Sequence, residues 1–479
     1  MPRSPCVAAL KGVSGSELEH DALTAAAERV EALLASLDEV TAASAIDSYR
    51  GGFDHSDPNN VLPFVAFQES KTTMSKTDKR APGARPEVSS WPELEDFSLV
   101  LGGPIYQFFR KARLEDRVED HLLLRVVVIS GIIWLPLLML CLVEGTLLGG
   151  VPIPFFSDIE THVRFLVTVP LLVAAELVVH LRMRAIVAQF VERGLVPEGS
   201  LERFRAAIRS AVTLRNSIAP ELLLLAIVLP LAYYSRAHLL SLESPTWYVR
   251  IENGSATVTR AGLWFWCVSN PILQLLAFRW YFRLFIWARF LRQVSRIDLA
   301  LIPTHPDRNG GLGFLGASAY ALSPLLTAHG AALAGFFANR IFHAGASLTD
   351  FKLEIVVLVT CLIGVVTGPL CVFAPQILAA KRKGLREYGI LGAEYTRDFD
   401  RRWLRSADRD GEALLGSGDI QSLADLGNAF SVIKEMNALP VGRDTLIQLI
   451  LVTVVPFVPL LFTMIPLEEL LDRIIGAVF

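Results

Sequence analysis

Long apolar segments alternate with polar ones along most of the chain after residue 125. Each is close to the roughly 20 apolar residues that a helix needs to cross a hydrocarbon core of about 30 Å. Their expected bounds are residues 126–143, 165–181, 218–234, 261–296, 315–339, 355–373 and 446–465. The pattern predicts an all-α fold: a polytopic membrane helical bundle of about seven transmembrane helices.

The composition agrees with a membrane protein and limits the classes of partner that the protein can bind. Of the 479 residues, 52% are hydrophobic and 19% are charged, which is too apolar for a soluble chain. The formal net charge of −3 argues against a nucleic-acid partner, which would require a basic face. The five cysteines show no CxxC spacing, so we expect buried packing residues and no metal site. No cofactor motif is present.

The polar segments divide the chain into four regions. Residues 1–95 are small and polar and predict a disordered or loosely helical tail, in which Met74 is an alternative start. Residues 96–375 hold the first six spans. Residues 376–445 predict a helical cytosolic subdomain, and residues 446–479 a seventh span followed by an amphipathic helix.

Two stretches suggest contact with the membrane surface. Residues 91–125 mix apolar and basic positions, which predicts a helix lying on the cytosolic interface. The end of the fourth segment, RWYFRLFIWARFLRQVSR, interleaves aromatic residues with arginines, and we expect it in the headgroup layer.

The basic residues indicate an orientation. Loops two–three, four–five and six–seven carry twenty-four Lys and Arg, whereas the three loops facing the other way carry six. The positive-inside rule then predicts a cytosolic N-terminus and a periplasmic or extracellular C-terminus.

Residues 297–316 form the sharpest break, with two prolines followed by a glycine-rich run. Glycine permits backbone conformations that are closed to other residues. One interpretation is a backbone nest that binds a phosphate or an anionic headgroup; the other is a turn that caps the fifth span. The candidate residues are His305, Asp307, Arg308, Gly310 and Gly311.

Several polar residues fall inside the predicted spans, where such residues are costly and usually face the bundle interior. Glu176 is expected to be buried, with partners on the fourth or fifth span. A polar path and a static set of hydrogen bonds both fit this pattern. The candidates are Glu176, His329, Asn270, Gln274 and Arg279.

Five motifs, FSLVLGGPIYQ, RWYFRLFIWARFLRQVSR, PTHPDRNGGLGFL, GSGDIQSLADLGN and MIPLEELLDRI, make the region from residue 97 onward similar to a family of uncharacterised bacterial multi-pass membrane proteins. The resemblance implies a bacterial inner membrane location and no particular activity.

Three functions remain open from the sequence. A transporter or channel is favoured by the polar residues in the spans, and a membrane scaffold or regulator by the helical subdomain. A lipid-modifying enzyme is the third, although no catalytic set is recognisable. Membrane lipids, including anionic headgroups at the cytosolic face, are the expected partners, and a homo-oligomer is compatible with the sequence.

Overall fold

The computed structural model describes residues 97–100, 102, 122–240, 246–252, 255–405 and 418–464. The predictions for the tail, for most of the amphipathic segment before Arg125 and for the C-terminal amphipathic helix lie outside these residues.

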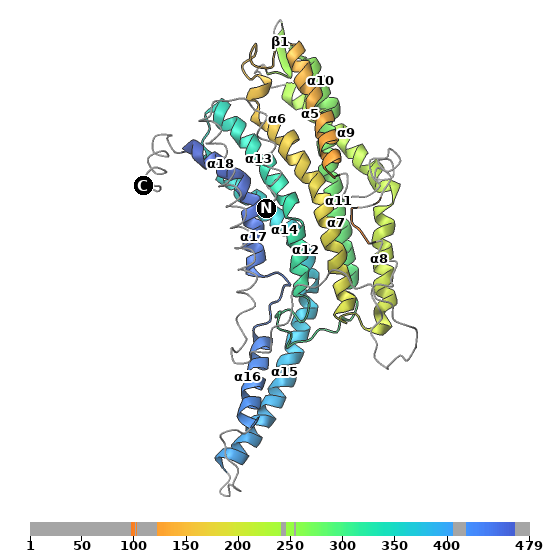
Figure 1. Ribbon diagram of the computed structural model, residues 1–479, viewed down its shortest axis with the longest axis vertical. Coiled ribbons are helices and arrows are strands. Elements are labelled where there is room, and N and C mark those ends of the chain that lie inside the picture. The colour runs from red at the N-terminus through yellow and green to blue at the C-terminus, as the bar shows by residue number, and fades with distance from the viewer. Residues whose placement is uncertain are drawn as a thin grey trace, which may run out of the picture. The chain divides into compact units, whose positions relative to one another are not determined.

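The described chain is a helical bundle, as predicted (Figure 1). Among these described residues, six helices are long and apolar enough to cross a membrane. The number rises to seven if one bent pair of helices is counted as a single span. The fold class expected from the hydrophobic pattern is therefore confirmed.

The spans follow the predicted order. Their helices are α5 (Leu122–Val143); α6 (Ile159–Val163), η4 (Arg164–Thr168) and α7 (Val169–Glu192); α8 (Leu201–Arg215) and α9 (Ile218–Leu240); α10 (Arg260–Trp264), η6 (Phe265–Ser269) and α11 (Asn270–Val294); α12 (Gly316–Ala321) and α13 (Ser323–Ala344); α14 (Lys352–Thr367) and η9 (Gly368–Phe373); and α17 (Arg443–Val454), η11 (Val455–Phe457), α18 (Val458–Leu461) and η12 (Phe462–Met464).

Short elements connect the spans. They are η3 (Phe155–Ser157), η5 (Glu198–Ser200), η7 (Gly313–Leu315), η8 (Leu348–Phe351) and an antiparallel hairpin of β1 (Val249–Glu252) and β2 (Ser255–Val258).

The third span is the bent one. The helix axis bends by 44° between α8 and α9. The break falls between Arg215 and Ile218, and Pro220 lies in the first turn of α9, where its missing N–H costs no helical hydrogen bond.

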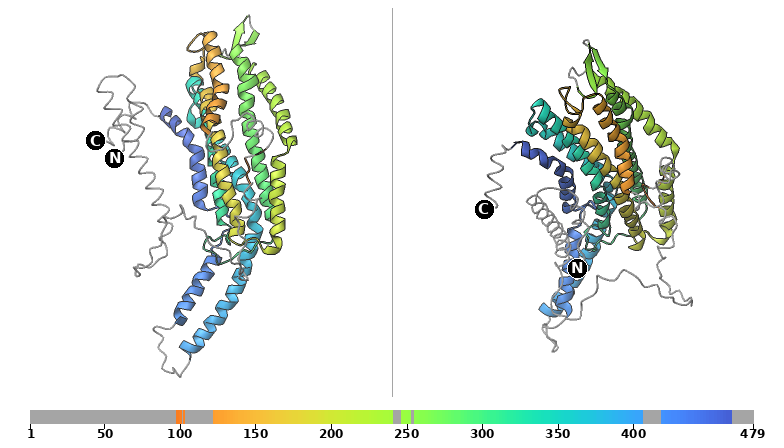
Figure 2. Two further views of the ribbon diagram at one scale, coloured as in Figure 1. Left: turned by 45° about the vertical axis from the view of Figure 1, so that its right-hand side comes forward. Right: turned by 45° about the horizontal axis from the view of Figure 1, so that its top comes forward.

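The helices alternate in direction, so the connections gather at two ends (Figures 1 and 2). The connections after α5, α9 and α13 lie at one end with β1 and β2, which we call the β-hairpin end. The connections after α7, α11 and α14 lie at the other, which we call the arginine-rich end. There α15 (Ala374–Phe399) and α16 (Gly418–Lys434) extend beyond the other helices as a helical hairpin, with η10 (Asp400–Leu404) after α15. The predicted helical segment between spans six and seven is therefore present.

Two surface predictions are corrected as to which side chains face outward. Residues 97–100 are not helical, and Phe97 is buried against the ring of Phe290 at 5.5 Å between centroids. In the aromatic stretch of α11, Trp280, Trp287 and Phe290 are also buried. These rings pack inward because α8 and the 97–100 segment cover that face of α11, which the sequence pattern does not reveal.

Of the four cysteines that the structure describes, the prediction of burial holds for Cys141 alone. It is buried, whereas Cys267, Cys361 and Cys371 are exposed on the helix surfaces. Apolar side chains on a span can face lipid as readily as protein, so an apolar neighbourhood in the sequence does not predict burial.

Candidate functional site

A cavity of about 530 Å³ lies between spans two, four and five. It begins beside Asp158 and Tyr248 at the β-hairpin end and follows α11 as far as Tyr281. Its length along that span, from Phe265 to Tyr281, is about 24 Å at 1.5 Å per residue. The polar lining residues are Asp158, Glu160, Thr161, Arg164, Thr168, Tyr248, Trp266, Asn270, Gln274, Tyr281, His329 and Asn339.

Two turns of π-helix border the cavity. The amide of Val169 bonds the carbonyl of Arg164, and that of Asn270 bonds Phe265, so each spans five residues instead of four. In both cases a proline follows at once, Pro170 or Pro271. Because proline has no N–H and crowds the carbonyl four residues before it, it favours such a break. Single π-turns inside helices often occur at functional sites.

Asp158 fixes the mouth of the cavity. It caps α6 by accepting from the Thr161 amide at 3.2 Å, and it accepts from the Thr161 hydroxyl at 2.7 Å. Trp247 Nε1 and Asn339 Nδ2 each donate to it at 2.8 Å. The carboxylate therefore ties spans two and five to the β-hairpin end. Burial, followed by the Asp158 charge, raises the pKa of nearby Tyr248 to about 12, which keeps that phenol neutral.

His329 lies deeper in the cavity in a defined tautomer. Its Nδ1 lies 2.8 Å from the carbonyl of Leu325, which can only accept, so Nδ1 carries the proton. Its Nε2 lies 2.6 Å from the hydroxyl of Tyr281. In the neutral ring Nε2 accepts from Tyr281, and the phenol oxygen keeps a lone pair for another donor.

Three buried polar atoms on the lining have no hydrogen-bond partner among the described residues. They are Trp266 Nε1, Gln274 Oε1 and Asn339 Oδ1. The Asn339 amide is oriented by its bond to Asp158, and its oxygen has no partner among the described residues. A buried polar group without a partner costs about 1–3 kcal/mol. A small shift of the lining side chains that exposed these atoms to the cavity would give them water or a polar solute as a partner.

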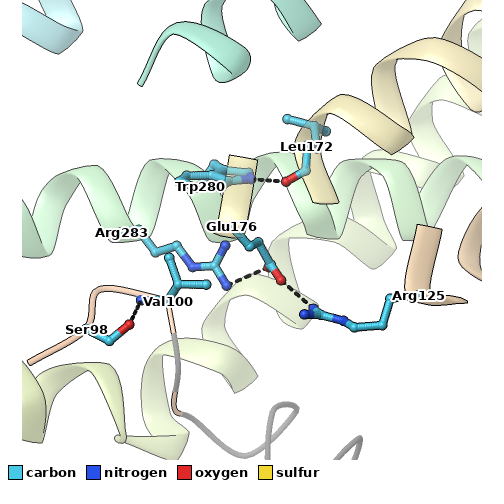
Figure 3. A network of polar contacts seen from close by, with 7 residues as sticks. All are labelled: Ser98, Val100, Arg125, Leu172, Glu176, Trp280 and Arg283. Carbon is cyan, nitrogen blue, oxygen red and sulfur yellow. Dashed lines mark hydrogen bonds and ion pairs between the residues drawn. The ribbon is translucent and has the colours of Figure 1, made fainter. Parts of the chain in front are cut away.

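Glu176 belongs to a separate cluster (Figure 3). Its carboxylate forms ion pairs with Arg125 of α5 and with Arg283 of α11, the latter at 2.8 Å. All three side chains are buried. On the cavity side, Trp280 Nε1 donates to the carbonyl of Leu172, one helical turn before Glu176.

The predicted polar path divides into two sites. Asn270, Gln274 and His329 line the cavity, whereas Glu176 and Arg279 line a second pocket of about 210 Å³. No described residue lines both. Glu176 is buried and contacts span four as expected, but its ion-pair partners are Arg283 and Arg125. None of the candidates that the sequence placed at its depth is an ion-pair partner.

The glycine-rich turn is held by its own aspartate. Asp307 accepts from the amides of Asn309, Gly311 and Gly313 at 2.9, 3.1 and 2.8 Å. His305 Nδ1 lies 2.9 Å from the same carboxylate. The amides that a nest would offer to an external anion thus bond Asp307, and this geometry favours the capping interpretation.

The turn also joins the helical hairpin to the bundle. Arg308 has a φ of 55°, and its carbonyl accepts from the Asn437 amide at 2.8 Å. Its guanidinium pairs with Glu435 at 3.1 Å. Gly310, with a φ of 67°, accepts from the Ile302 amide at 3.1 Å. The turn is therefore a structural junction between spans four and five and the chain that follows α16.

Replacing Gly311 with Val should destabilise the protein. Gly311 has a φ of 99°, and an added Cβ would lie 3.0 Å from the Leu195 side chain. A β-branched residue at positive φ costs about 1–3 kcal/mol. Thermal unfolding in detergent should show a clear loss, whereas Gly199→Val, at a position with open space and ordinary φ, should change little. Equal melting temperatures for the two variants would contradict the strained turn.

Sequence reasoning missed several cavity residues. Asp158 and Asn339 lie at the ends of spans, and Tyr281 was assigned to the headgroup layer. The prolines that follow the π-turns in spans two and four were the available signal, because proline inside an apolar span marks a break in the helix.

No protein family, curated protein or solved structure matches this chain.

Proposed function

We propose that this integral membrane protein is a transporter- or channel-like protein whose cavity admits a small polar solute from the β-hairpin end. The observation that supports it is the cavity of about 530 Å³ between three spans, lined by side chains with unpaired polar atoms. Polar groups at membrane depth are costly and typically mark solute pathways.

The far end of the cavity favours a transporter over an open pore. Beyond Tyr281 the spans are packed by a buried apolar core that includes Leu284, Trp287 and Leu325. A solute that entered the cavity would have to wait for this core to rearrange, as alternating access requires.

A membrane scaffold remains the second candidate because the α15–α16 hairpin exposes large apolar side chains. Ile390, Leu391 and Leu404 are 54%, 50% and 70% exposed. Contiguous exposed apolar residues often mark protein contacts. A lipid-modifying enzyme is less well supported, since the carboxylate of the turn is already bonded to its own backbone.

We infer the orientation and location from charge and resemblance. Twenty-four of the thirty Lys and Arg in the six loops belong to the arginine-rich end, which we assign to the cytosol. The family resemblance favours a bacterial inner membrane.

Labelling from one side at a time would test this orientation. In a background without native cysteines, a cysteine replacing the exposed Lys383 of α15 should react with an impermeant maleimide only in inside-out vesicles. One replacing Thr257 of β2 should react only in right-side-out vesicles. The reverse pattern would contradict the assignment.

The cavity itself can be tested with a cysteine at Ala332. Ala332 lines the cavity, whereas Ala226 is exposed on the outside of α9 and serves as the control. A charged methanethiosulfonate reagent needs water to form the reactive thiolate, so Ala332→Cys should react at least tenfold faster than Ala226→Cys. The reaction should occur from the β-hairpin end.

The sidedness of that reaction separates the candidate functions. In a transporter the Ala332 cysteine should also react, more slowly, from the arginine-rich end. The apolar core between the cavity and that end must open at times during transport. Reaction from the β-hairpin end alone would favour the scaffold. Equal rates at Ala332 and Ala226 would show that the cavity is dry.

A further inference from the structure

Among the residues that the structure describes, the cluster around Glu176 brings three arginines close to one carboxylate. Arg125 and Arg283 share the Glu176 carboxylate. Arg279, one helical turn from Arg283, forms no hydrogen bond or ion pair with any described residue. It lines the second pocket together with Arg125.

A neighbouring small pocket adds one charge of each sign. Arg279 and Arg283 line it with Glu221 and Arg215. Among the described residues, four arginines and two glutamates line these two pockets. Arg279, which has no ion-pair partner among the described residues, is therefore the available donor for an anion.

The cluster lies at the depth of one headgroup layer. Arg279 is about 28 Å along the fourth span from Arg260, and Glu176 about 26 Å along the second span from Ile159, at 1.5 Å per residue. Arg125 is in the first turn of α5. Measured from the β-hairpin end, these distances approach the hydrocarbon thickness of about 30 Å. The arginines therefore lie near the opposite membrane surface, at the arginine-rich end.

An apolar groove runs from the arginines toward the middle of the membrane. The second pocket is otherwise lined by aliphatic residues of α5, α7 and α11 that lie on the midplane side of Arg125, Glu176 and Arg279. A further pocket of about 240 Å³ continues it between α9 and α11 and shares Ile272 and Leu275 with it. An acyl chain of the leaflet at the arginine-rich end would run in the same direction.

We propose that this groove binds an anionic phospholipid from the leaflet at the arginine-rich end. Its phosphate pairs with Arg279 and Arg125, and one acyl chain occupies the groove between α5, α9 and α11. The bound lipid gives Arg279 an anionic partner, and its acyl chain fills the two adjoining pockets. This site is independent of the solute cavity.

Thermal unfolding of the purified full chain in detergent, with native mass spectrometry to count bound lipids, tests the proposal. Phosphatidylglycerol should raise the melting temperature of the wild type by several degrees and stay bound. Phosphatidylcholine and inorganic phosphate should produce much smaller shifts. Arg279→Gln should keep or raise the melting temperature without lipid, because a buried charge is removed, and should lose the phosphatidylglycerol shift.

Two further variants complete the design. Arg292→Gln removes the same charge from an exposed position on α11 and should keep the full shift. Ile129→Trp leaves every charge in place but fills the groove, and it should reduce the shift by half or more even if Arg279→Gln fails to fold.

Three outcomes would overturn the lipid site. A full shift with Ile129→Trp would show that no acyl chain enters the groove. An equal shift with inorganic phosphate would show an anion site without a lipid. An equal shift in the Arg279→Gln and wild-type proteins would show that Arg279 does not bind the headgroup.

Discussion

Replacing Glu176 with Leu should remove most of the stability of the bundle. The carboxylate is the shared ion-pair partner of Arg125 and Arg283, and all three groups are buried. Without it both guanidinium groups lose their shared partner while they stay buried near Arg279, and loss of one partner from a buried pair costs about 3–5 kcal/mol. We expect a melting temperature lower by ten degrees or more in detergent, and less protein in the membrane fraction.

Glu202 provides a matched control. It also pairs with two arginines, Arg205 and Arg209, but on the exposed surface of α8. Exposed ion pairs contribute little to stability, so Glu202→Leu should leave the melting temperature almost unchanged. Equal behaviour of the two leucine variants would show that the Glu176 cluster is not buried in the folded protein.

A Gln at position 176 separates a structural role from a transport role. Gln can accept hydrogen bonds from the arginines but carries no charge, so Glu176→Gln should be destabilised less than Glu176→Leu. Because Glu176 does not line the cavity, the structure favours a role in packing. Loss of solute or proton flux in a folded Glu176→Gln protein would place the residue on the path after all.

The sequence predicted the helices well because hydrophobic length is a local property. A run of apolar residues in lipid must satisfy its own backbone hydrogen bonds, and a helix is the usual way. The seven expected segments correspond to helices. The polar segment between spans six and seven forms the α15–α16 helices.

Side-chain partners were much harder to predict because they depend on how each helix is rotated. Depth alone made Arg279 a candidate partner for Glu176, yet the ion pair is formed by Arg283, one turn further along the same helix. Arg125 lies 51 residues from Glu176 in the chain and pairs with it only because α5 packs beside α7. Phe97 and Trp287 were misplaced for the same reason.

The small residues of spans five and six show where the sequence predicts close helix packing and where it does not. The sequence predicted that span five packs inside the bundle. In its apolar 18-residue stretch 61% of the residues are buried, compared with 22% in the corresponding stretch of span six. Span six also has two glycines four residues apart, Gly364 and Gly368, but they pack against no other described helix. A Cβ added at either would meet no described atom of another element within 4 Å. Small residues permit close helix packing but do not identify which of them are used.

Replacing Gly330 with Ala should therefore destabilise the protein, although Ala normally favours a helix. A Cβ at Gly330 would lie 2.2 Å from the carbonyl oxygen of Thr453, so α13 and α17 would have to separate. Thr453 is fully buried at this contact, and backbone atoms cannot move aside as a flexible side chain can. Overpacking of this kind costs about 1–3 kcal/mol or more.

The control for Gly330 is Gly364→Ala, which should act in the opposite direction. Gly364 lies in the helical interior of α14 with open space around it, so Ala there should stabilise the protein by about 0.5–1 kcal/mol. The two variants make the same chemical change in two spans, and thermal unfolding should show melting temperatures on opposite sides of the wild type. A Gly330→Ala protein as stable as Gly364→Ala would mean that span seven does not pack against span five at Thr453.

Because Thr168 of span two donates to the carbonyl of Ala328 on α13, the helix that contains Gly330, separation at Gly330 should also alter the contact between spans two and five beside the cavity. The rate of Ala332→Cys modification measured in the Gly330→Ala background should therefore rise.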